Sequence, residues 1–390
     1  MVVTKLMWTS LDLFEKSHRY MWTNPIEWNS TRGKFRHNKL SAALLPWLGS
    51  ILSIILSGGA PTLILLCSQL FGYINLPLRE LIISVVITVL SWFGVIVEIL
   101  LLTLGTTLVS PINFLIDLER KLTSEYAIPT GRLDVLGIVL NISVVAFAIY
   151  PVTFIFFLYT DLDPLYLFGK YVVNKGPPCF FILTTIARPF VVLPFLQICR
   201  LFSILFSGLT VGCHLILSNI SWMERTSRVG PLLARVLRNH AILQIILQSI
   251  ENAVSALIAI IMLAGFLLSI LFNFTTIKMY HVIPMPLYLF FPAVGILIPM
   301  IIQVMLPMLI EVYEGEVLLH RRWRCALWLR HGNIKYLKRR LTGVKVLRMY
   351  AGIKCHLFYF VKKSTKATYY YAIWSYTISA MLSIRVVGAG

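Results

Sequence analysis

Seven long apolar stretches constrain this chain more than any other feature of its sequence. Each consists mostly of Leu, Ile, Val, Phe and Ala, and each has enough residues to cross a bilayer as a helix. With 58% hydrophobic and only 13% charged residues, a water-soluble globule could not bury this apolar surface. We therefore predict an all-α, polytopic membrane protein in the lipid bilayer, with spans near residues 44–70, 80–108, 135–160, 179–200, 253–273, 286–310 and 367–385.

The distribution of Lys and Arg predicts how these seven transmembrane helices are oriented. With a cytoplasmic N-terminus, 28 of the 35 basic residues fall in segments on the cytoplasmic side, as the positive-inside rule requires. The C-terminus is then extracellular. Because the net charge of +19 is spread over segments between apolar runs, rather than over one soluble face, we predict no nucleic-acid partner.

The fourth apolar run is longer than one span, because it continues from Leu201 to Ile220. A split into two spans at Arg200 would place segments 220–252 and 312–366, with 18 basic residues, on the outside. We therefore predict one helix whose inner part leaves the bilayer on the cytoplasmic side. Apolar residues interleave with basic ones in segment 312–366, which predicts amphipathic helices that cover this extension.

These features divide the chain into four predicted parts. They are a cytoplasmic N-terminal segment (1–43), transmembrane helices one to six (44–311) with the extension of helix four (201–220), a basic cytoplasmic helical anchor segment (312–366), and a final span with a short outer tail (367–390).

Signatures of catalysis and metal binding are missing from the sequence. It contains no Gly-rich phosphate loop, no GxSxG elbow and no HExxH motif. The eight histidines are scattered, and the six cysteines include no CxxC pair. We predict no enzymatic activity, no catalytic residue, no metal site and no cofactor.

Two charged residues and several aromatic residues are candidates for ligand binding. Glu98 lies midway along the second span and Arg188 lies within the fourth, where an unpaired charge is costly. They could form a pair or contact a polar ligand; the alternatives are a structural ion pair or side chains that extend to the interface. The outer halves of spans three to six hold aromatic residues that could line an apolar pocket or belong to interfacial belts, among them Tyr150, Phe154, Tyr159 and Tyr288.

The last span has a stripe of small and hydroxyl-bearing residues. Thr368, Ala372, Ser375, Ser379 and Ser383 recur every three or four residues, so they share one helix face. A pore wall needs such a face, because water and ions must replace part of their hydration there. Close helix packing through small residues is the alternative. The three serines are our candidate pore-lining residues.

A short motif accompanies this stripe. Thr368-Tyr369 is followed by the five residues 370–374 and then by Ser375-Tyr376, and the preceding stretch 344–352 is basic and contains glycine. Together with the inverted seven-helix topology, this pattern resembles the arthropod gustatory and odorant receptor superfamily, whose members carry Thr-Tyr, five apolar residues and Gln-Phe near the C-terminus. Thr368, Tyr369 and Tyr376 match the motif, and Ser375 stands where the family has Gln.

The resemblance implies a gustatory-receptor-like chemosensory protein in the plasma membrane. Such a protein would act as a ligand-gated, non-selective cation channel, opened by a small-molecule tastant or odorant and assembled as a homo- or hetero-tetramer with related receptors. The final helix would line the pore, helices two to six would enclose an outward pocket, and residues 201–220 and 312–366 would form the subunit contact. The alternatives are a seven-helix G-protein-coupled receptor, with its N-terminus outside, and a secondary transporter, supported by Glu98, Arg188 and the proline-broken helices.

Overall fold

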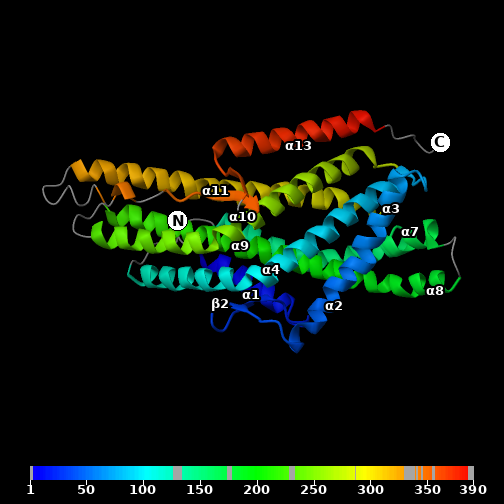
Figure 1. The fold of residues 1–390 in the computed structure, drawn as a ribbon, viewed down its shortest axis with the longest axis horizontal. Coiled ribbons are helices and arrows are strands. Elements are labelled where there is room, and N and C mark those ends of the chain that lie inside the picture. Colours follow the sequence, from blue (N-terminus) through cyan, green and yellow to red (C-terminus); the bar gives the residue numbers. More distant parts are fainter. Residues whose placement is uncertain are drawn as a thin grey trace.

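The protein is an elongated helical bundle with two short β-hairpins (Figure 1). The computed structural model describes residues 3–125, 134–173, 178–227, 233–285, 287–328, 339, 341–343, 346–353 and 356–384. The elements are α1 (Lys5–Ser17), β1 (Ile26–Asn29), β2 (Lys34–His37), α2 (Leu45–Ser53), α3 (Ala60–Leu70), α4 (Leu78–Glu125), α5 (Val135–Ile149), α6 (Phe154–Tyr159), α7 (Pro164–Tyr171), α8 (Pro178–Ala187), α9 (Val192–Ser227), α10 (Leu233–Lys278), α11 (Phe290–Trp328), β3 (Tyr350–Ile353), β4 (His356–Phe360) and α13 (Lys363–Ser383).

Six helical segments in the described part of the chain are long and apolar enough to cross a membrane, and they correspond to the first six predicted spans. They run over Ala42–Leu70, Leu78–Lys121, Val135–Tyr171, Thr184–Thr226, Arg235–Lys278 and Leu287–Cys325. Large apolar side chains remain exposed on their outer faces, for example Leu56, Ile96 and Ile142. In a multi-pass membrane protein these side chains face lipid. The six helical segments confirm the predicted all-α fold class.

Several helices are much longer than a bilayer is thick. The helices α4 and α10 contain 48 and 46 residues, which correspond to about 70 Å each at 1.5 Å per residue. The C-terminal ends of α4, α9 and α11 and the N-terminal end of α10 lie together (Figure 1), and we call this the basic end of the bundle. The prediction for the fourth apolar run is confirmed in one respect: α9 continues without a break through residues 201–220 to Ser227.

Prolines interrupt the third and fourth spans. A 3₁₀ turn at Tyr150–Thr153 contains Pro151 and separates α5 from α6, and a second turn at Arg188–Val191 contains Pro189 and separates α8 from α9. Proline removes a helical hydrogen bond and clashes with the preceding turn, so both helices bend at these points. The first bend lies at the cavity described below, which Tyr150 lines.

The N-terminal segment is folded onto the bundle. The helix α1 packs on α5 and α9, while the antiparallel hairpin of β1 and β2 packs on α4. Apolar side chains of α1, including Leu11 and Phe14, join the largest hydrophobic core of the protein. Residues 3–43 are thus a structural part of the bundle rather than a separate arm.

The predicted helical anchor segment 312–366 is only partly helical. The helix α11 continues to Trp328, but strands β3 and β4 form an antiparallel hairpin that packs on α10. The prediction of helix is therefore wrong for Tyr350–Ile353 and His356–Phe360. Aromatic and β-branched side chains favour strands here, and at Gly352 an added Cβ would lie 2.5 Å from the backbone oxygen of His356, which only glycine tolerates. Most of 329–345 lies outside the described residues, as does the outer tail 385–390.

The last helix, α13, lies along one side of the bundle and runs away from its basic end (Figure 1). It packs on α10 and α11. With 21 residues it is about 30 Å long, which is enough to span a bilayer, but its sequence is less apolar than the six spans above. The crossing of the membrane by α13 stays a prediction.

Candidate ligand cavity and a buried polar network

An apolar cavity lies between α4, α5, α9, α10 and α11. The sequence places many large aromatic side chains on the inner faces of these helices. The aromatic residues of the lining are Phe147, Tyr150, Phe195, Phe202, Phe272 and Phe290. Aliphatic side chains and the Cys199 thiol complete the wall. The composition of this lining fits a small, mostly apolar guest.

The aromatic rings around the cavity hold one another in place. The Phe290 ring meets Tyr150 and Phe157 edge to face, with centroids 6.2 and 5.6 Å apart. The Phe202 ring stacks on Phe93 and Phe147 at 4.9 and 5.8 Å. Such pairs contribute about 0.5–1.5 kcal/mol each beyond their buried area, so the wall is largely preorganised.

The structure places two of the six predicted ligand-pocket residues at this cavity. Tyr150 lines it, and Phe154 packs directly behind it, with its ring 5.3 Å from that of Phe195. Tyr288 instead donates a hydrogen bond to the Thr276 carbonyl oxygen at 2.7 Å. Tyr159 is 84% exposed at the end of α6.

Arg188, another of the six, is held by acidic groups near the ends of α6 and α7. Its guanidinium donates to Asp161 at 2.6 Å, to Asp163 at 2.9 Å and to the Leu158 carbonyl oxygen at 2.9 Å. Asp163 is fully buried and also caps α7 by accepting from the Tyr166 amide. Arg188 therefore forms a structural link between the third and fourth spans.

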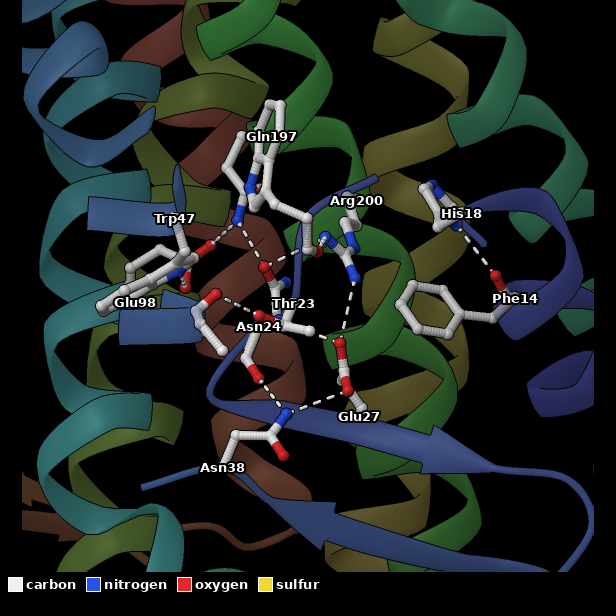
Figure 2. Close-up of polar contacts among 12 residues, drawn as sticks. Phe14, His18, Thr23, Asn24, Glu27, Asn38, Trp47, Glu98, Gln197 and Arg200 are labelled. Atoms are coloured by element: carbon white, nitrogen blue, oxygen red, sulfur yellow. Dashed lines mark hydrogen bonds and ion pairs between the residues drawn. The ribbon is translucent and has the colours of Figure 1, made fainter. Parts of the chain in front are cut away.

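The sixth residue, Glu98, lies in a separate buried polar network (Figure 2). One carboxylate oxygen accepts from the Trp47 indole at 3.0 Å, and the other accepts from the Gln197 amide at 2.5 Å. The Gln197 carbonyl oxygen in turn accepts from the Trp22 indole at 3.1 Å. With 1% exposure, Glu98 depends on these donors in place of water.

Arg200 is the positive group of the same network (Figure 2). Its guanidinium donates to the Trp22 carbonyl oxygen at 2.6 Å and to the Asn24 side chain at 3.1 Å, and lies 3.7 Å from Glu27. The Asn38 amide then joins Glu27 to the Asn24 backbone at 2.9 and 2.8 Å. Opposite charges are thus linked through amides, and the N-terminal segment supplies most of the partners of Arg200.

The cavity and the polar network share one stretch of α9. Gln197 and Arg200 point into the network, while Ile198, Cys199 and Phe202 line the cavity. Phe195, Cys199 and Phe202 follow each other at helical spacing, so this period was the signal for an inward face of the fourth span. Phe195 and Phe202 were not singled out from the sequence.

Two of the three motif residues of α13, Tyr369 and Tyr376, contact the neighbouring helix α10. The Tyr369 hydroxyl donates to the Met262 carbonyl oxygen of α10 at 2.8 Å, and the Tyr376 ring meets Phe266 edge to face at 5.6 Å. Tyr369 approaches this closely because residue 265 is glycine: a Cβ there would lie 3.1 Å from the tyrosine oxygen. The Thr368 hydroxyl donates to its own helix, at the Ser364 carbonyl oxygen.

The candidate pore residues Ser375, Ser379 and Ser383 are exposed on α13. The hydroxyls of Ser379 and Ser383 donate to carbonyl oxygens four residues earlier, at 2.9 and 2.7 Å. This bonding lets a serine face either water or a low-dielectric neighbour. Their role in a pore, like the ligand role of the six residues above, stays a prediction.

We compared the chain with known proteins once this geometry was established. No family model and no curated protein sequence matches it. Among solved structures, it matches the insect olfactory receptor OR5 from Machilis hrabei in complex with eugenol, with a TM-score of 0.55 over 98% of each chain at 13% sequence identity. The fold is that of an insect olfactory receptor.

The insect olfactory receptor fold accounts for the architecture over nearly the whole chain. It is a helical membrane fold, and the match extends over 98% of this chain. This finding confirms the structural side of the resemblance that the Thr368-Tyr369 motif indicated.

Proposed function

We propose that this protein is a chemosensory receptor of the plasma membrane that acts as a ligand-gated cation channel. The observation that carries the proposal is the likeness in fold, over 98% of both chains, to an olfactory receptor solved with the small aromatic molecule eugenol. The cavity supports it, because a space with an aromatic, apolar wall suits a ligand of that chemical class.

The wall of the proposed pore would be α13. Its serines are exposed, whereas Ile373 and Thr377 are buried on the face toward the bundle. A tetramer would place four such serine faces around one axis, where their hydroxyls can replace part of the hydration of a passing cation. The lower apolarity of α13 supports this position, because a pore helix is not surrounded by lipid.

A route from ligand to pore runs through α10 and α11. Leu268 and Ile301 line the cavity on these helices. Within two residues of them, Phe266 contacts the Tyr376 ring and Gln303 accepts a hydrogen bond from Tyr370 at 3.0 Å. A ligand that displaces the cavity wall would therefore act on helices that α13 touches.

The charged residues favour a receptor over a secondary transporter. Glu98, Arg188 and the proline-broken helices were the support for transport, and both charged side chains are bonded to protein groups. Residues that bind a transported ion must be able to exchange these partners for the ion, so their hydrogen bonds and ion pairs remove the two charged residues as support for that alternative.

Electrophysiology in oocytes or cultured cells tests the proposal with a panel of small aromatic odorants and tastants. We expect an agonist to evoke a cation current in wild type, and Ser379→Leu to reduce unitary conductance severalfold. The neighbouring exposed variant Ile378→Leu is the control and should conduct as wild type does. If Ser379→Leu keeps both conductance and ion selectivity, α13 does not line the pore.

The proposed orientation is tested separately with epitope tags at both ends of the full chain. We expect the C-terminal tag to be stained on intact cells and the N-terminal tag only after permeabilisation. An N-terminal tag accessible on intact cells would favour the G-protein-coupled alternative and exclude the channel as drawn.

A further inference from the structure

Two histidines and one glutamate converge between α10 and α11 near the basic end of the bundle. None of the three residues lines the cavity described above. Glu316 and His320 are one helical turn apart on α11, and His240 faces them from α10. The His240 Nε2 atom lies 2.9 Å and the His320 Nε2 atom 3.5 Å from the same Glu316 oxygen. All three residues are buried, with Glu316 and His240 fully inaccessible.

The cluster is short of hydrogen-bond partners. The second Glu316 oxygen, His320 Nε2 and His240 Nδ1 have none, although each is buried. Leaving a buried polar atom unpaired costs about 1–3 kcal/mol, so a ligand that engages the second Glu316 oxygen and His320 Nε2 would remove this penalty at both atoms. The Trp323 ring packs against both imidazoles, at 5.3 and 5.4 Å, which limits the motion of the two rings.

We propose that His240, Glu316 and His320 bind one zinc ion that joins the inner ends of α10 and α11. Two imidazole nitrogens and a carboxylate are a donor set that zinc prefers, and Mg²⁺ or Ca²⁺ would instead require oxygen ligands. A divalent ion also balances the buried Glu316 charge. Bidentate binding by Glu316 would use its unpaired oxygen, and His320 would contribute its unpaired nitrogen.

The distances fit this ion after small side-chain rotations. The three ligand atoms all lie within 4.8 Å of one another. In a tetrahedral site with bonds of about 2.0–2.2 Å, ligand atoms are about 3.4 Å apart. Side-chain rotations that move each ligand atom by less than about 2 Å therefore bring all three atoms into the coordination sphere. The inference rests on this geometry alone and does not depend on the proposed channel function.

The test measures metal in the full chain, purified in detergent with a tag that contains no histidine. After growth with zinc sulfate, we expect close to one zinc per subunit by elemental analysis. After chelation, Co²⁺ should restore the visible absorption bands of a tetrahedral Co²⁺ site. Zinc titration should show at least about tenfold weaker binding in Glu316→Gln and in His320→Gln.

The control is His214→Gln, which changes a buried histidine of α9 outside the cluster and should bind zinc as wild type does. Should the single variants fail to fold, the triple replacement His240→Leu, Glu316→Leu and His320→Leu removes all buried polar groups at once. Wild type without zinc and without Co²⁺ bands, or equal zinc content in wild type and a folded variant, would overturn the assignment.

Discussion

Replacement of Arg200 by leucine should release the N-terminal segment from the bundle. Arg200 is 4% exposed and donates two hydrogen bonds to residues 22–24, at 2.6 and 3.1 Å. Hydrogen bonds from a charged group contribute about 1.5–3 kcal/mol each. Their loss therefore removes about 3–6 kcal/mol before any relaxation.

Two features reduce this figure. Asn24 keeps a hydrogen bond from Gln197 at 3.3 Å, and Glu27 keeps its bonds from the Asn24 amide and the Asn38 side chain. Replacement by leucine also removes the buried Arg200 Nε atom, which has no hydrogen-bond partner. We expect a net loss of about 3 kcal/mol, which is roughly a hundredfold increase in the local opening of residues 20–40.

Hydrogen exchange in the full-length protein measures this opening at the backbone amides of the β1–β2 hairpin. The control is Lys34→Met, a substitution on the same hairpin. It breaks the ion pair between Lys34 of β2 and Asp117 of α4. That pair is 37% and 42% exposed, so its loss should cost at most about 1 kcal/mol. If Arg200→Leu accelerates exchange no more than Lys34→Met does, the network does not hold the segment.

Three further variants test other parts of the structure. Tyr369→Phe removes one hydrogen bond to α10 and should lower stability by about 1 kcal/mol. Thermal unfolding, monitored by size-exclusion chromatography, measures this loss. Tyr371→Phe is the control and should leave stability unchanged, because Tyr371 is 75% exposed. Cys199→Phe fills part of the cavity and should weaken agonist potency at least about tenfold, whereas Cys67→Phe on the exposed face of α3 should leave it unchanged. Burial, helped by a nearby arginine charge, holds the pKa of His18 below its ordinary value of 6.5. The unfolded segment therefore takes up a proton first as the pH falls below about 6.5, and stability should decline there in wild type more steeply than in His18→Gln.

The membrane architecture was predictable because it depends on composition along the chain. Apolar runs of sufficient length must become helices in lipid, since each backbone polar group needs a partner within its own segment. The bias of basic residues excluded a break at Arg200, and α9 is indeed continuous there. Both arguments use only local sequence and the properties of the bilayer.

The partners of the buried polar residues were not predictable in this way. Hydropathy indicates that Glu98 needs a partner, but Trp47 and Gln197 are separated from it by 51 and 99 residues and carry no charge. The cluster of His240, Glu316 and His320 shows the same limit: the histidines are scattered along the sequence, and His240 comes from another helix, 76 residues before Glu316. Which residues meet depends on how the helices pack, and one sequence does not specify it.

The arrangement around α9 determines which helices a ligand in the cavity can move. Gln197 and Arg200 hold this part of α9 to Glu98 and to the N-terminal segment through buried hydrogen bonds, and breaking these would cost several kcal/mol. The opposite wall, on α10 and α11, is apolar, and apolar contacts can slide with little loss of energy. Because a close-packed interior transmits displacement rather than absorbing it, a bound ligand should shift α10 and α11, the two helices on which α13 packs.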